Sequence, residues 1–89
     1  METVVQFLFR RKLYSCVFFI DMAEKPDYIF CLLEDKELME EFSDEVTIKT
    51  DGRQMLPKKD DYPALVALRQ AIFSAVKNTK EFAGMVKHH

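Results

Sequence analysis

Runs of β-branched and aromatic residues, separated by short polar breaks, fill the first third of the chain. The runs at residues 3–9, 13–22 and 28–33 have the composition of strands. A basic break separates the first two runs, and Pro26 and Asp27 supply turn chemistry before the third. Strands joined by such short connections pair with their neighbours, so the pattern predicts an antiparallel meander.

The pattern then changes from helical to strand-like. Residues 35–42 are rich in helix formers and predict a helix of about two turns. Residues 45–50 alternate polar and apolar side chains, which indicates a fourth strand. Asp51 and Gly52 form the strongest hairpin signal in the chain, so the strand is expected to return briefly over residues 53–56.

A long amphipathic helix is predicted over residues 62–77. Asp60 or Asp61 can cap it, and Pro63 is tolerated in the first turn, where its missing N–H has no helical partner. Apolar residues recur at spacings of three and four, as expected for one buried helix face. This stripe consists of Leu65, Leu68, Ile72, Ala75 and Val76.

The end of the sequence carries signals for a helix stop and a new start. Asn78 can adopt the left-handed conformation that ends the long helix, and Thr79 can cap a last short helix over residues 82–86. We therefore predict a single α+β domain over residues 1–89. It contains an antiparallel four-stranded sheet, in which a short helix links the meander to a fourth strand or hairpin. The long C-terminal helix packs on one face of this sheet.

Composition narrows the class of protein. The 89 residues are 48% hydrophobic and 31% charged, which is typical of a small globular domain and excludes disorder as the main state. A net charge of −2 argues against nucleic acid as a partner. No apolar run approaches the roughly 20 residues of a spanning helix, and the N-terminus lacks the features of a signal peptide. We expect a soluble, cytoplasmic protein without a membrane partner.

The candidate metal ligands and thiols do not form a convincing site. Cys16 and Cys31 lie in apolar runs and are expected to be buried and reduced. A hairpin centred on residues 24–26 would place the two cysteines on opposite faces of the sheet. His88 and His89 are adjacent at the end of the sequence, where they could also derive from an affinity tag. We therefore assign no metal site.

Catalysis has no better support. A Ser or Cys nucleophile needs a base within hydrogen-bond reach, and the terminal pair are the only histidines. Two glycines cannot build a phosphate-binding loop. Residues 34–45 hold a cluster of acidic side chains, which we interpret as a solvated patch around the short helix. The sequence thus predicts a non-enzymatic protein with no catalytic residues, cofactor-binding residues or cofactor.

The informative feature is an excess of apolar residues on the second and third strands. In both strands, the odd-numbered and the even-numbered residues, which point to opposite faces, are mostly apolar. In a sheet with one solvated face, apolar and polar residues should alternate along each strand. The long helix can cover only one face. The short helix and the tail could partly cover the other through the apolar residues Leu38, Met39, Phe42, Phe82, Met85 and Val86.

We therefore predict a protein-interaction or self-association module that forms a homodimer or binds a protein partner through the second face or through a sheet edge, at the first or fourth strand. The centre of the dimer is expected at one of Val17, Phe19, Ile29 and Leu33. The alternative is a small-ligand or substrate site between the sheet and the C-terminal helix. Its most plausible polar groups are Tyr14, Tyr28, Arg69 and Lys77.

Overall fold

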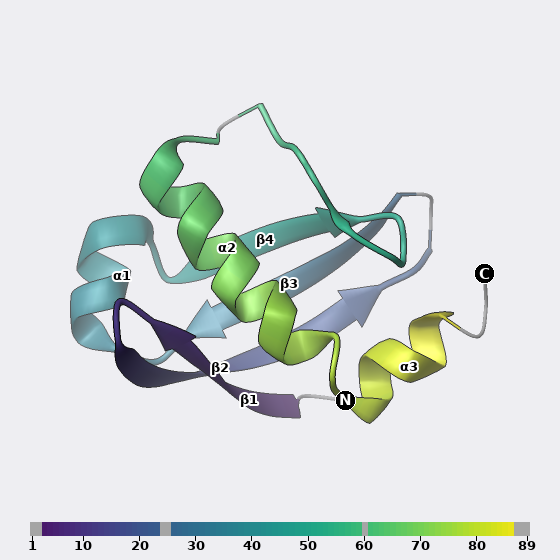
Figure 1. Cartoon of the computed structure of the whole chain (residues 1–89), viewed down its shortest axis with the longest axis horizontal. Helices are drawn as coiled ribbons and strands as arrows, with labels where there is room; N and C mark the ends of the chain where they lie inside the picture. Colours follow the sequence, from purple (N-terminus) through teal and green to yellow (C-terminus); the bar gives the residue numbers. More distant parts are fainter. Residues whose placement is uncertain (1–2, 24–25, 60, 87–89) are drawn as a thin grey trace.

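The computed structural model describes residues 3–23, 26–59 and 61–86, with side chains as far as Gly84. These residues form an antiparallel sheet in the order β1-β2-β3-β4-β5, together with three helices (Figure 1). The strands are β1 (Thr3–Phe9), β2 (Lys12–Asp21), β3 (Asp27–Leu33), β4 (Glu45–Thr50) and β5 (Met55–Leu56). The helices are α1 (Lys36–Phe42), α2 (Pro63–Val76) and α3 (Lys80–Val86).

The predicted α+β fold is confirmed, with the short return after β4 forming a fifth strand. The Thr50 hydroxyl donates to the carbonyl of Gln54 (2.7 Å) and accepts from the N–H of Gly52 (3.1 Å). The Asp51 carboxylate accepts from the N–H groups of Gln54 (2.9 Å) and Arg53 (2.8 Å), and these bonds hold the pKa of Asp51 below its ordinary value. Gly52, with φ of 93°, takes a conformation that favours glycine.

The core lies between α2 and one face of the sheet, which we call the covered face (Figure 1). The predicted stripe of α2 points into this core, and Leu68, Ile72 and Val76 are each 0% exposed. Alternate residues of the strands complete the core from the sheet side. The fully buried ones include Phe7, Phe18, Ile29 and Ile48. One helix and one face of one sheet therefore account for most of the buried apolar surface.

The start of α2 differs from the prediction. Tyr62 is the N-cap residue and makes no side-chain capping bond. Asp61 does not cap the helix, because its carboxylate accepts from the N–H of Lys58 (2.8 Å) and pairs with the buried guanidinium of Arg69. A buried charge needs an opposite charge more than the helix end needs a cap. Asp60 lies outside the described residues.

The end of α2 also differs from the prediction. Asn78 is not among the residues with positive φ, and its side-chain amide donates instead to the carbonyl of Ser74 (3.0 Å). This bond satisfies a carbonyl of the last turn without a left-handed residue. The predicted cap of the last helix is confirmed, since the Thr79 hydroxyl accepts from the N–H of Phe82 (3.2 Å). None of the described helices is long and apolar enough to cross a membrane.

Candidate functional site

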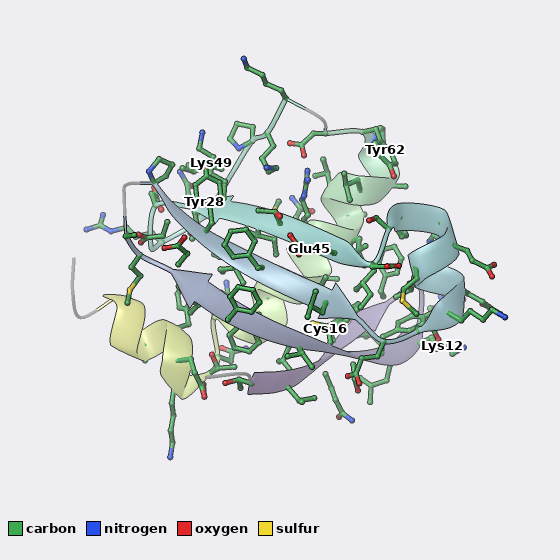
Figure 2. The ribbon with its side chains drawn as sticks, turned by 180° about the vertical axis from the view of Figure 1, so that it is seen from behind. Lys12, Cys16, Tyr28, Glu45, Lys49 and Tyr62 are labelled. Carbon is green, nitrogen blue, oxygen red and sulfur yellow. The ribbon has the colours of Figure 1, made fainter. Side chains whose placement is uncertain are left out.

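The sheet has a second face that no described helix covers, which we call the open face (Figure 2). Its apolar side chains come from β1, β2 and β3, and we call them the open-face patch. The patch consists of Val4, Leu8, Leu13, Val17, Phe19, Tyr28, Phe30 and Leu32. Leu8 is 66% exposed, Val4 62% and Leu13 57%, so the patch is solvated at its rim.

Aromatic rings form the centre of the open-face patch. The ring of Phe30 stacks on that of Phe19 with centroids 5.3 Å apart and planes at 28°. The ring of Tyr28 also stacks on that of Phe30, with centroids 6.3 Å apart and planes at 24°. Phe19 nevertheless remains 39% exposed. A row of stacked rings on a sheet face that no described helix covers presents a firm apolar surface to the solvent.

The sequence allowed the short helices to cover part of the second face, but in the structure they do not cover the open face. Leu38 of α1 is 3% exposed and belongs to the core, and the ring of Phe42 packs against Phe9 with centroids 6.0 Å apart. Phe82 of α3 packs edge-on against Phe73 of α2, with centroids 5.6 Å apart. The apolar residues of α1 and α3 that the structure describes thus extend the core of the covered face. The side chains of Met85 and Val86 lie outside the described residues.

The predicted dimer centre needs correction at two of its four residues. Val17 and Phe19 lie on the open face, but Ile29 and Leu33 are buried on the covered face. Phe30 and Leu32 take their place on the open face. The register of the β2–β3 hairpin is shifted by one residue from the predicted one, and a shift of one residue exchanges the faces of a strand.

The same shift corrects the placement of the cysteines. Cys16 pairs with Leu33 and Cys31 pairs with Phe18, so both thiols lie on the covered face instead of on opposite faces. Both are fully buried and free. The Cys31 thiol donates a hydrogen bond to Cys16, which lowers the pKa of Cys16 and raises that of Cys31. Reactive cysteines are accessible and sit among positive charges, so this buried pair is suited to packing.

Charged groups mark the two ends of the open face. Glu45 lies at the start of β4 and is exposed, and Lys49 lies near its end. Beside Lys49, the ammonium group of Lys58 lies 5.8 Å from the ring centroid of Tyr28. A pocket of about 350 Å³ opens there, lined by Tyr28, Lys49, Pro57, Lys58 and Lys59. Figure 2 shows Tyr28 and Lys49 together, with Glu45 further along the sheet toward α1.

The charges of the β1–β2 hairpin are directed elsewhere. The guanidinium of Arg10 forms two hydrogen bonds with the carboxylate of Glu41 in α1, at 2.8 and 2.7 Å, and this contact lowers the pKa of Glu41. The same guanidinium lies 4.7 Å from the ring centroid of Phe9, and the ammonium of Lys12 lies 5.3 Å from that of Tyr14. Both rings belong to the covered side of the sheet.

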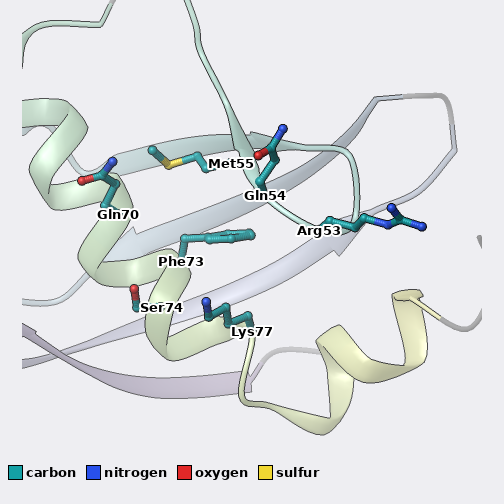
Figure 3. A pocket seen from close by; sticks show the side chains of 7 residues that line it. All are labelled: Arg53, Gln54, Met55, Gln70, Phe73, Ser74 and Lys77. Carbon is teal, nitrogen blue, oxygen red and sulfur yellow. The ribbon is translucent and has the colours of Figure 1, made fainter.

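The groups named for the alternative ligand site do not converge. Tyr14 is on the covered face, Tyr28 is on the open face, and Arg69 is engaged by Asp61. Only Lys77 lines a pocket between α2 and the hairpin that follows β4. This pocket, of about 450 Å³, is also lined by Arg53, Gln70, Phe73 and Ser74 (Figure 3). Among the described residues, no three Cys, His, Asp or Glu side chains could hold a metal ion.

Comparison with known proteins adds no assignment to these features. The chain matches no protein-family model, no curated protein and no solved structure. The functional argument therefore rests on the open face itself.

Proposed function

We propose that the protein is a self-association module whose open face packs against the open face of a second copy. The observation that carries this proposal is the open-face patch, with its stacked aromatic centre and exposed aliphatic rim. A contiguous apolar surface of this kind on a small soluble domain is typical of an interaction surface. A sheet-on-sheet dimer would give both copies the second apolar layer that the sequence calls for.

The size of the open face suits a dimer. The four long strands have six to ten residues each. With a spacing of about 4.8 Å between strands and a rise of about 3.3 Å per residue, four strands of about seven residues present a projected area of about 440 Å². Side-chain relief raises the accessible area above this value, toward the roughly 800 Å² per partner of a standard interface.

The shape of the face favours a second sheet over a small ligand. One pocket described above lies between α2 and the hairpin after β4, and the other lies at the lysine end, where Tyr28 is the one ring of the aromatic centre in its lining. A small molecule needs a concave site that encloses most of its surface. The open face of a second copy is instead a flat surface of the same kind, apolar at its centre and polar at its ends. In a dimer, the two apolar centres would pack against each other.

Phe19→Asp tests the proposal. A carboxylate at the centre of a dry interface would lose its water without gaining a partner, so we expect this variant to be monomeric at concentrations where the wild type is a dimer. Gln70→Asp is the matched control, because it adds the same charge at an exposed position of α2 on the opposite side of the molecule. Light scattering coupled to gel filtration gives the mass of each.

The fold of the variants is checked by far-UV circular dichroism, and Leu32→Asp provides a second substitution on the same face should Phe19→Asp fail to fold. Phe19 and Leu32 are 39% and 37% exposed, so the monomer should tolerate both changes. A folded Phe19→Asp variant that keeps a dimeric mass, or a Gln70→Asp control that dissociates equally, would contradict the proposed interface.

A further inference from the structure

We infer that the two copies pack with their strands antiparallel, so that the lysine end of each open face meets the acidic end of the other. The inference rests on the proposed self-association and specifies the orientation of the partner. The lysine end consists of Lys49, Lys58 and Lys59, and the acidic end consists of Glu34 and Glu45.

The charge polarity of the open face is clearest along β4. Glu45, Thr47 and Lys49 all project to this face, so opposite charges stand two residues on either side of a central threonine. Lys58 and Lys59 strengthen the positive end through the pocket that they share with Lys49. Glu34 directly follows β3 and is exposed at the negative end.

The strand register determines which residues of the two copies would face each other in a symmetric dimer. Thr47, Phe30 and Phe19 lie in one row across three strands. The row on one side begins with Lys49 and Tyr28, and the row on the other side begins with Glu45 and Leu32. A twofold axis that runs along the middle row, between the two sheets, stacks that row on itself. It also places Lys49 opposite Glu45 of the second copy, twice in the dimer.

A twofold axis parallel to the strands gives a poorer match. It would place the acidic end of β3 and β4 over the β1–β2 hairpin of the second copy, since both lie at the same end of the sheet (Figure 1). Two of the cations of that hairpin are already directed away from the open face. Arg10 binds Glu41, and Lys12 lies over Tyr14 on the covered side.

One negative charge, that of Asp21, lies at the same end of the open face as the lysines. Asp21 lies on the open face of β2 in the same row as Tyr28 and Lys49. It is two strands away from Lys49, a separation of about 10 Å, and it is exposed at the end of its strand. At that distance salt largely screens its effect on the lysines, whereas facing charges in a closed dimer are in contact.

A charge-swap experiment tests this orientation. The first variant, Lys49→Glu with Lys58→Glu, makes both ends acidic. The second, Glu34→Lys with Glu45→Lys, makes both ends basic. In either homodimer like charges would face each other at both contacts, so each variant alone should dimerise at least about tenfold more weakly than the wild type at low salt. In the mixed dimer, every basic end meets an acidic end.

The expected result is therefore recovery of dimer when the two variants are mixed. Native mass spectrometry with one variant labelled with ¹⁵N distinguishes the mixed dimer from both homodimers. Arg11→Glu, a charge reversal on the β1–β2 hairpin, is the control and should dimerise like the wild type. A salt titration should narrow the difference between wild type and variants, because the contacts lie at the rim of the interface.

The outcomes separate the two proposals. A wild-type protein that stays monomeric would overturn the self-association on which the inference rests. A dimeric wild type whose two charge variants also dimerise normally, or whose mixture gives no mixed dimer, would overturn the antiparallel orientation alone. Dissociation caused by Arg11→Glu would favour the twofold axis parallel to the strands and would likewise contradict the inference.

Discussion

Replacing Leu68 with Ala should destabilise the protein strongly, because Leu68 lies in the middle of the buried stripe of α2 and is 0% exposed. The change removes the equivalent of about three methylene groups, and the lost transfer free energy is about 2.4 kcal/mol at about 0.8 kcal/mol per group. The cavity left between helix and sheet adds to this, so we expect a loss of about 3 to 4 kcal/mol in the free energy of unfolding.

Gln70→Ala is the control, because truncation of an exposed side chain on the same helix, away from the open face, removes little buried surface. Its expected cost is below about 1 kcal/mol, the usual range for a surface substitution. Urea melts at fixed protein concentration measure both values, and thermal melts should show a drop in Tm of more than about 12 °C for Leu68→Ala. Equal losses in the two variants would refute the assignment of the covered face.

Further predictions concern the thiols, the hairpin and the buried ion pair. Cys16 and Cys31 should react with Ellman's reagent only after unfolding, and protein prepared without reductant should then yield two free thiols. The backbone hydrogen bonds of the hairpin lower the pKa of Asp51, so their contribution to stability is complete above its ordinary value of 3.8 and is lost as the pH falls through the lower folded value. A carboxylate titration followed by NMR should therefore give a midpoint below 3.8. Asp61→Ala leaves the Arg69 guanidinium without this carboxylate and should cost about 1 to 3 kcal/mol in a urea melt.

Local sequence signals were sufficient for most of the fold. The first strand and the strand before the hairpin were predicted with the bounds that the structure shows, and α2 was predicted to within one residue at each end. In each case the composition, the periodicity and the flanking turn residues agreed. The fifth strand has only two residues, too few for a periodic pattern, and only the Asp51–Gly52 signal pointed to it.

Register was the property that the sequence did not determine. Strands β2 and β3 carry apolar residues on both faces. A shift of one residue in their pairing therefore puts one apolar set of side chains in place of another, and the apolar pattern does not distinguish the two registers. This ambiguity put Cys16 and Cys31 on opposite faces and put Ile29, instead of Phe30, among the candidate residues of the second apolar face. The N-cap of α2 was predicted wrongly for a similar reason. Asp61 pairs with Arg69 instead of capping the helix, and this contact forms only in the folded chain.

The excess of apolar residues on the central strands pointed correctly to a second, separate apolar surface, but its location depends on the tertiary structure. Leu38, Phe42 and Phe82 could have packed on either side of the sheet as judged from the sequence. In the structure they meet core side chains such as Phe9 and Phe73 on the covered side. Because they contribute to this one core, the open-face patch stays exposed.

The mass of the wild-type protein in solution tests the central claim most directly. Sedimentation equilibrium over a range of micromolar concentrations should give an average mass that rises with concentration from that of the monomer toward twice 10.5 kDa. The dry aromatic centre and aliphatic rim of the proposed interface predict a dimer in this range. A mass of 10.5 kDa at every concentration would contradict the account.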